Sequence, residues 1–207
     1  MADVSSCPVA TPVVVLLSGS GRTLQNLLDL QAAGELPISV RHVISSRDDA
    51  YGLVRAEKAG VARTVLRRKD APDAATYTAR VFDACRAAGA ELVLCAGWLV
   101  LLRPIPDDYR GKVLNIHPAL LPAFGGKGFY GDKVHAAVLS AGVAVTGCTV
   151  HLVDDEYDHG EVLLQCQVPV LPGDTVESLG HRVFDAELEA YPTAIRLWLS
   201  GRASARG

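Results

Sequence analysis

The sequence predicts an α/β fold in which a doubly wound, mostly parallel sheet is covered by helices on both faces. Strand-like and helix-like segments alternate through the first half of the chain, the order that right-handed β-α-β crossovers require. The strand-like segments are continuous apolar runs, as expected for strands buried on both faces. The second half breaks the alternation and predicts an antiparallel addition followed by a long C-terminal helix.

The first half begins with a strand at 13–17, where β-branched and aliphatic residues follow one another without interruption. A glycine-rich turn follows, and then a helix at 22–33 in which leucines recur at helical spacing. The same reasoning predicts the next elements, in chain order, as a strand at 39–45, a helix at 52–59, a strand at 61–66, a helix at 74–88 and a strand at 91–96.

The second half opens with a short strand at 113–116, which runs into a loop rich in Gly and Pro. After a helix at 133–141, two longer strands at 145–153 and 162–170 enclose a turn centred on Asp158. A last helix is predicted from about Thr175, with an interruption or kink at Pro192 and frayed residues after Gly201.

No linker or internal repeat divides the chain, so 1–207 is predicted to form a single domain. Within it, the N-terminal half, about 13–110, is expected to bind phosphate, and the second half, about 111–200, to carry the catalytic residues.

Bulk composition excludes several classes of protein. The chain is 49% hydrophobic and 21% charged, with a net charge of −3, so no basic face indicates nucleic-acid binding. The longest apolar run, 92–102, is too short to span a membrane, and the first residues lack the pattern of a secretory signal. Five scattered cysteines without a C-x-x-C pair predict reduced thiols and a cytoplasmic location, and no metal site is visible.

The turn from Ser18 to Thr23 is the first candidate binding site. Its two glycines allow the backbone to approach a ligand closely, and the helix that follows offers free N–H groups to a phosphate. Leu24 stands where a dinucleotide fingerprint requires a third glycine, and no Gly-Lys-Ser/Thr follows as in a Walker loop. A phosphate monoester is the preferred ligand, and a tight turn that binds nothing is the alternative.

A second candidate site lies where the strand at 113–116 ends. Strand alternation directs Asn115 and His117 to one face. An amide donor can hold an oxyanion, and an imidazole can transfer a proton near neutral pH. Asp158, in the later turn, can orient the imidazole. Each residue alone also fits a structural role, His117 as a hydrogen-bonded core histidine and Asp158 as a turn former.

Taken together, these motifs resemble those of the folate-dependent formyltransferase family. The resemblance rests on the string Asn115 to Pro122 and on Asp158-x-Gly160, and it extends over nearly the whole chain, from about Val13 to Gly201. It includes the glycine turn at 18–21 and further matches at Gln25-Asn26-Leu27, Ala96-Gly97-Trp98, Gly147 to His151, and Glu187-x-x-x-Tyr191-Pro192.

The resemblance implies the sheet of the formyltransferase type and transfer of a formyl group from 10-formyltetrahydrofolate, a co-substrate, to the amine of glycinamide ribonucleotide in purine biosynthesis. It implies catalysis by Asn115, His117 and Asp158. Glu187 would recognise the substrate amine, and the backbone amides of Gly21, Arg22 and Thr23 would hold its phosphate. The implied folate pocket consists of Trp98, Leu99, Val100, Leu101, Leu102, Val153, Asp154, Asp155, Glu156 and Tyr157. Its partners would be small molecules, with no nucleic acid and no membrane, and a homodimer stays open.

Two departures from the family pattern bear on pocket detail. Leu99-Val100 stands where members often have Met-Arg, so an arginine contact near the folate is missing, and Glu187-Leu188 replaces the usual Glu-His.

Relatives with other substrates are the alternatives. Formyltetrahydrofolate hydrolase carries an extra N-terminal domain, for which a first strand beginning by Val13 is expected to leave no room. Methionyl-tRNA formyltransferase has a basic C-terminal domain and a Trp-Arg-Gly-Ala loop, where this chain has Phe124 to Gly128. Sugar-nucleotide formyltransferases tend to be longer. A non-catalytic protein that binds a phosphate ligand is the alternative from another class.

Overall fold

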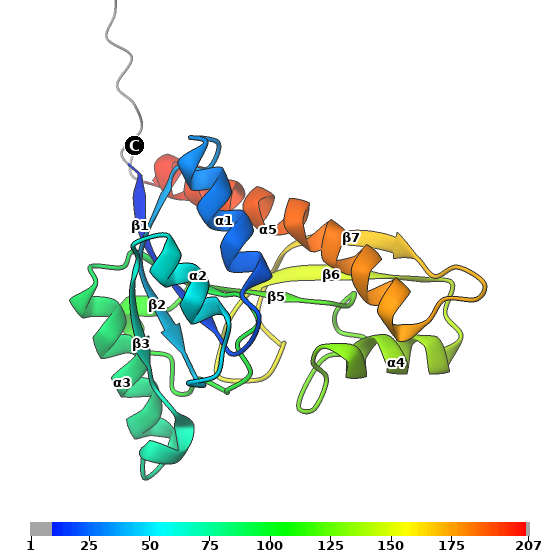
Figure 1. Ribbon diagram of the computed structural model, residues 1–207, viewed down its shortest axis with the longest axis horizontal. Helices are drawn as coiled ribbons and strands as arrows, with labels where there is room; N and C mark the ends of the chain where they lie inside the picture. The colour runs from blue at the N-terminus through cyan, green and yellow to red at the C-terminus, as the bar shows by residue number, and fades with distance from the viewer. Residues whose placement is uncertain (1–9, 206–207) are drawn as a thin grey trace, which may run out of the picture.

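The computed structural model describes residues 10–205 and contains one seven-stranded sheet with the strand order β3-β2-β1-β4-β5-β6-β7 (Figure 1). Parallel pairing joins the first five strands in this order, and β6 and β7 are antiparallel additions. The predicted fold class is therefore confirmed. The strands are β1 (Thr11–Leu17), β2 (Ile38–Ser45), β3 (Ala62–Val65), β4 (Leu92–Cys95), β5 (Val113–His117), β6 (Val145–Leu152) and β7 (Val162–Pro169).

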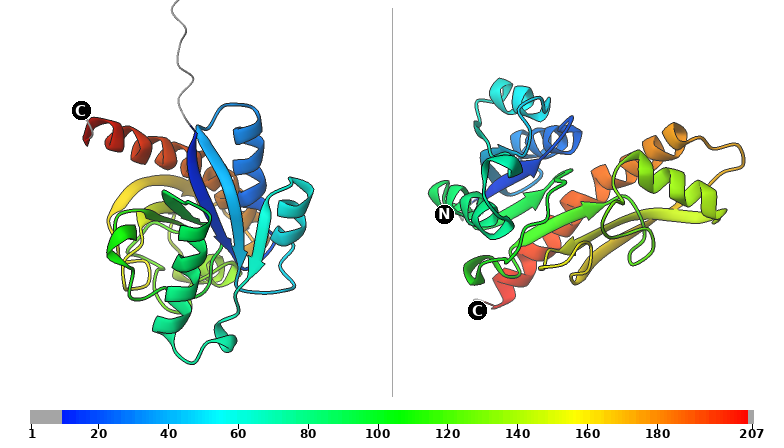
Figure 2. Two further views of the ribbon diagram at one scale, coloured as in Figure 1. Left: turned by 90° about the vertical axis from the view of Figure 1, so that its left-hand side faces the viewer. Right: turned by 90° about the horizontal axis from the view of Figure 1, so that it is seen from below.

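Helices cover both faces of the sheet. The alternating side chains of β1 separate into two cores, with Val13 and Val15 in one and Val14 and Leu16 in the other. The first core packs against α1, α4 and α5, and the second against α3, on the opposite face (Figure 2). Burial on both faces explains the continuous apolar runs of the sequence. The helices are α1 (Arg22–Ala32), α2 (Gly52–Lys58), α3 (Ala74–Ala87), α4 (Asp132–Ala141) and α5 (Val176–Ala205), with short 3₁₀ helices at Arg68–Asp70 and Asp107–Tyr109.

Helix α5 is longer and more continuous than the sequence predicts. It passes through Pro192 without a break and ends at Ala205, so the predicted interruption is wrong, whereas fraying after Gly201 stays a prediction. Figure 1 shows α5 extending along β6 and β7. Tyr191, Ala194 and Ile195 on either side of the proline are fully buried, and this packing holds the helix together where proline removes a backbone hydrogen bond.

The sheet places the candidate site residues at a single edge. The connection after β1 leads to β2 on one side of it, whereas β4 and β5 lie on the other side, so the winding direction changes between β1 and β4. Ligands of open α/β sheets bind at such a switch point, outside the carboxyl ends of the strands. The glycine turn follows β1, Gly97 and Trp98 follow β4, and His117 ends β5.

No helix within residues 10–205 is long and apolar enough to cross a membrane. The described cysteines are all free thiols, with Cys85, Cys95 and Cys148 buried and Cys166 partly buried. Cys7 lies outside the described residues.

Tyr191 anchors α5 to the sheet, and its removal provides a test. Its hydroxyl lies 3.0 Å from the carbonyl oxygens of both Cys95 and Leu114. We predict that Tyr191→Phe lowers the free energy of unfolding by about 1 to 3 kcal/mol, because buried acceptors lose their donor. Urea denaturation measures the change. The control Thr193→Ala removes an exposed hydroxyl bonded within α5 and should change stability by less than about 0.5 kcal/mol. Equal losses in the two variants would contradict the anchoring role.

Candidate active site

A cavity of about 1060 Å³ opens at the carboxyl edge of the sheet. Six segments enclose it: the β1–α1 turn, the end of β4, the end of β5, the 126–133 loop with the start of α4, the Asp158 turn, and one face of α5. It is thus large enough for two small-molecule substrates.

The glycine turn forms one end of the cavity. Gly21 is the N-cap of α1 in the left-handed conformation, with φ of 69°. A Cβ atom at this position would lie 2.5 Å from the Cα of Gly52 on α2. Arg55 of α2 donates from Nε to the Ser20 carbonyl at 3.0 Å. The fold itself therefore requires Gly21, in addition to the ligand approach that the sequence suggests, and α2 supports the turn from behind.

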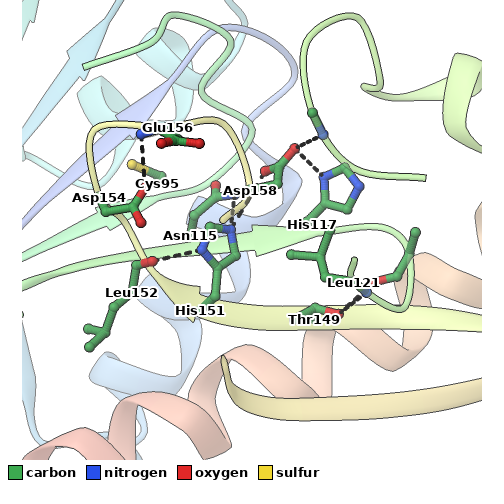
Figure 3. A network of polar contacts seen from close by, with 12 residues as sticks. Cys95, Asn115, His117, Leu121, Thr149, His151, Leu152, Asp154, Glu156 and Asp158 are labelled. Carbon is green, nitrogen blue, oxygen red and sulfur yellow. Dashed lines mark hydrogen bonds and ion pairs between the residues drawn. The ribbon is translucent and has the colours of Figure 1, made fainter. Parts of the chain in front are cut away.

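At the other end, the carboxylate of Asp158 lies between two imidazoles (Figure 3). One oxygen is 3.6 Å from Nδ1 of His117, the other is 3.6 Å from Nε2 of His151, and the N–H of Gly126 donates to the first at 2.9 Å. Asp158 has a left-handed φ of 52°, and Gly160 lets the chain pass close to the Leu152 carbonyl, where any Cβ would collide. The Asp-x-Gly pattern thus reflects a turn that directs the carboxylate inward.

Hydrogen bonds fix the protonation pattern of both rings. His117 Nε2 lies 2.8 Å from the Phe124 carbonyl, and because a carbonyl only accepts, this nitrogen carries the hydrogen. A neutral His117 then presents the lone pair of Nδ1 to the Asp158 side. By the same argument His151 donates from Nδ1 to the Leu152 carbonyl at 2.8 Å and accepts from Asn115 Nδ2 at 3.1 Å.

Burial and charge act in opposite directions on these groups. Burial lowers the pKa of His117, and the nearby Asp158 carboxylate only partly opposes this, so the ring is neutral near pH 7. Burial by itself would raise the pKa of Asp158. The contact with His151, the nearby His117 and the Gly126 N–H outweigh burial and hold that pKa below its ordinary value. The site therefore combines a neutral imidazole with an ionised carboxylate.

A hydroxyl and an amide hold the loop that follows His117. Thr149 on β6 donates to the Ala119 carbonyl at 2.7 Å and accepts from the Leu121 N–H at 3.0 Å. Gln165 on β7 donates to the Leu121 carbonyl and to the Thr149 hydroxyl, each at 2.9 Å. The antiparallel strands β6 and β7 thus position the loop that follows His117, the last residue of the parallel strand β5.

A second, smaller cavity of about 60 Å³ adjoins the first, and Asn115 and Asp158 line both. Most of the residues that the resemblance assigns to folate line this smaller cavity: Trp98, Val100, Leu101, Leu102, Val153, Glu156 and Tyr157. Leu99 instead lines the large cavity.

Asp154 and Asp155 line neither cavity. Asp154 accepts from the Glu156 N–H and from His159, and Asp155 accepts from the Ile105 N–H. These two carboxylates thus have contacts that stabilise their own loop, and their assignment to the folate pocket stays a prediction.

Glu187 projects from α5 into the large cavity, beside the glycine turn. Burial raises the pKa of its carboxyl to about 7, although the positive charge of Arg22 opposes the shift. Within residues 10–205, no group of three or more His, Cys, Asp or Glu side chains is arranged to hold a metal ion.

Comparison with known proteins gives this arrangement a context. The sequence profile of the family described as "Formyl transferase" matches residues 11–195. The chain belongs to the formyl transferase family. It is 35% identical to the phosphoribosylglycinamide formyltransferase of Haemophilus influenzae, with 92% of this chain and 88% of that protein covered. It is also 40% identical to the trifunctional purine biosynthetic protein adenosine-3 of Bos taurus, of which it spans only 19%.

Solved structures agree with the sequence relatives. Glycinamide ribonucleotide transformylase 1 from Symbiobacterium toebii superimposes with a TM-score of 0.89 at 41% identity, covering 97% of this chain and 93% of that one. Phosphoribosylglycinamide formyltransferase from Bacillus halodurans gives a TM-score of 0.85 at 30% identity, with 92% and 96% covered. The formyltransferase fold expected from the sequence is thereby confirmed.

Two buried histidines of this formyl transferase escaped the sequence analysis. His151 shares a face of β6 with Thr149, and this alternation is the signal that could have directed attention to it. His135 lies on α4 against Gly180 of α5 and lines the large cavity, and its Nδ1 has no hydrogen-bond partner among the described residues. No sequence pattern marks His135, because its neighbours are the apolar residues of an ordinary amphipathic helix.

The double constraint on Gly21 is testable by mutation. We predict that Gly21→Ala lowers the free energy of unfolding by about 1 to 3 kcal/mol, because the side chain is strained at positive φ and collides with Gly52. Gly19→Ala is the matched control, since a Cβ there meets nothing within 4 Å, and its effect should stay below about 0.5 kcal/mol. Thermal and urea unfolding measure both changes. Wild-type stability in Gly21→Ala would show that the approach of α2 does not constrain the turn.

Proposed function

We propose that this protein transfers the formyl group of 10-formyltetrahydrofolate to the amine of glycinamide ribonucleotide, a step of purine biosynthesis. The observation that carries the proposal is that Asn115 and Asp158 line both the large cavity, with its glycine turn, and the adjoining small one. An acceptor with its phosphate at the turn and a donor that enters from the side of the smaller cavity would meet at these residues. The names of the relatives from Haemophilus influenzae and Symbiobacterium toebii support this choice of acceptor.

The reaction forms one C–N bond and breaks another. The lone pair of the acceptor amine attacks the formyl carbon, and the carbonyl electrons move to oxygen. As the tetrahedral intermediate collapses, the bond to the folate nitrogen breaks, the acceptor nitrogen loses a proton, and the folate nitrogen gains one. Catalysis therefore requires a donor for the oxyanion and a path for the proton.

The side-chain amide of Asn115 is suited to donate a hydrogen bond to the oxyanion. Its Nδ2 carries two hydrogens, and the contact with His151 at 3.1 Å engages one of them. The second is available to the formyl oxygen. His151 thus acts as a positioning residue that sets the orientation of the Asn115 amide, and the Leu152 carbonyl in turn fixes the tautomer of His151.

His117 and Asp158 together are suited to accept the proton that the acceptor nitrogen loses. The neutral imidazole can accept a proton at Nδ1, on the side of Asp158, and the carboxylate stabilises the imidazolium that forms. The 3.6 Å separation is longer than a hydrogen bond and would shorten when the ring is charged. Both carboxylate oxygens face histidines, so Asp158 couples His117 to the residue that positions Asn115.

The proposal includes the arrangement along the chain. A single domain provides the phosphate end from its N-terminal half, about 13–110, and the catalytic residues from about 111–200. The backbone amides of Gly21, Arg22 and Thr23 bind the phosphate, Glu187 binds the acceptor amine, and the walls of the smaller cavity bind the pterin. A cytoplasmic location and a homodimer stay predictions, which fractionation and the molar mass in solution would test.

A comparison of three acceptors tests the proposed function. The purified protein is mixed with 10-formyltetrahydrofolate, and release of tetrahydrofolate is followed with glycinamide ribonucleotide, with water alone and with charged initiator tRNA. We expect release only with glycinamide ribonucleotide. Release in water alone would identify a hydrolase, and release only with the tRNA would identify another acceptor.

The catalytic roles predict a pattern of rates. Asn115→Ala, His117→Ala and Asp158→Asn should each lower kcat by about 100-fold or more, because each removes a group acting on developing charge. The double variant His117→Ala/Asp158→Asn should lose much less than the product of the single losses, since the two act as one unit. Pre-steady-state and steady-state kinetics measure the loss of kcat in each variant. Multiplicative losses would show that Asp158 acts independently of His117.

Glu187 predicts a pH dependence of acceptor binding. Its pKa of about 7 means that the carboxyl is neutral below pH 7 and becomes a carboxylate above it. The stability that the neutral form contributes is lost as pH rises through 7, whereas attraction for the acceptor ammonium is gained. We predict that KM for glycinamide ribonucleotide falls as pH rises from about 6 to about 8, and that Glu187→Gln abolishes this change. A pH-dependent KM that persists in Glu187→Gln would assign the titration to another group.

A further inference from the structure

The side chain of Arg22 has a position that backbone binding of phosphate does not explain. Arg22 is the first residue of α1, and its guanidinium lies over the ring of Phe184 on α5, 3.9 Å from the centroid. Both residues line the large cavity beside the glycine turn. No hydrogen bond or ion pair in the described part of the chain engages the guanidinium, so its fork of N–H donors is uncommitted.

A second arginine at the turn is arranged differently. Arg55 donates to the Ser20 carbonyl at 3.0 Å and to the Gln25 side chain at 3.1 Å, so its donors serve the protein itself. Arg55 thus holds the turn, and Arg22 faces the space in front of it. Lys127 and Lys133 also line the cavity from the 126–133 loop and α4, but Lys133 donates to the Tyr130 hydroxyl at 2.8 Å.

The aromatic platform determines what Arg22 can bind. Stacking on Phe184 holds the planar guanidinium flat against one wall of the cavity, and this reduces the side-chain entropy that binding would otherwise remove. The planar fork matches two oxygens of a phosphate, which a lysine ammonium cannot do. Phe184 is three residues before Glu187, so both project from the same face of α5. Arg22 therefore shares the cavity wall with the carboxylate proposed to bind the amine.

We propose that the guanidinium of Arg22, held by the face of Phe184, is a specificity-determining contact that selects acceptors carrying a phosphate monoester. The inference rests on the proposed function for the identity of the acceptor. The backbone N–H groups of the turn bind the phosphate without a formal charge, and Arg22 supplies that charge together with a bidentate geometry. The competing explanation is that the Arg22–Phe184 contact only joins α1 to α5.

Paired acceptors separate the two explanations. KM and kcat are measured with glycinamide ribonucleotide and with glycinamide riboside, which lacks the phosphate. Arg22→Gln should raise KM for the ribonucleotide about 10- to 100-fold more than it changes KM for the riboside, the effect expected for one charge-assisted contact. Loss of the Arg22 charge beside Glu187 acts on both acceptors alike, so the ratio of the two KM values isolates the phosphate contact. Arg22→Lys keeps the positive charge but loses the planar pair of N–H donors. Its KM for the ribonucleotide should therefore lie between that of the wild type and that of Arg22→Gln. Phe184→Leu removes the platform alone and should raise the ribonucleotide KM a few-fold.

Arg63→Gln is the control for loss of one positive charge, because Arg63 is an exposed residue of β3 paired with Glu57 at 2.8 Å, outside the cavity lining. It should leave both KM values unchanged. Equal changes for the two acceptors in Arg22→Gln, or a lowered Tm with an unchanged ratio of the two KM values, would overturn the proposal.

A direct titration distinguishes failure of this inference from failure of the proposed function. Ribose 5-phosphate is titrated calorimetrically into the wild type and into Arg22→Gln. If the wild type fails to formylate glycinamide ribonucleotide but binds ribose 5-phosphate about 10-fold or more tightly than Arg22→Gln does, the phosphate contact stands and the acceptor assignment falls. Equal binding by the two proteins would remove Arg22 from the phosphate site.

Discussion

Burial of one carboxylate, Asp158, is the constraint on which the arrangement of the active site depends. Its side chain is only 12% exposed, so the Gly126 N–H that donates to it, and the His117 ring once that ring is protonated, are needed to stabilise the charge. His117 comes from the last parallel strand, His151 from the antiparallel addition, and the Gly126 N–H from the long loop between them. Two neighbouring strands and a loop are thus held together around a single negative charge.

The same constraint places the proposed catalytic residues where the last parallel strand meets the antiparallel addition. β5 ends with His117 next to β6, which pairs with it through Asn115 and His151. Successive side chains of β6 point to opposite faces of the sheet, and the two faces make different contacts. Cys148 and Val150 pack into the core beneath α5, whereas Thr149 and His151 hold the His117 loop and the Asn115 amide. A shift of one residue in the pairing would bury these polar groups under α5 and expose the core residues.

The phosphate end is built on a different principle. Here backbone packing sets the geometry, because a Cβ at Gly21 would collide with Gly52 on α2 and a Cβ at Gly52 would collide with Leu17 on β1. Arg55 then bonds to the turn from outside the cavity, and Arg22 remains free inside it. The two ends of the cavity are connected by α5. Its Tyr191 is bonded to Cys95 at the end of β4 and to Leu114 near the start of β5, and its Phe184 and Glu187 face the ligand space.

The sequence by itself determined the fold class, because apolar runs and glycine turns are local signals that sheet burial and chain reversal require. It also placed Asn115, His117, Asp158 and the glycine turn at strand ends, which parallel topology brings to one edge. Only the tertiary structure decided the contacts of His151 and Phe184, and the loop-stabilising contacts of Asp154 and Asp155. It also decided that α5 continues through Pro192. These outcomes depend on contacts between segments far apart in the chain, and no local pattern encodes which distant atom a buried side chain will meet.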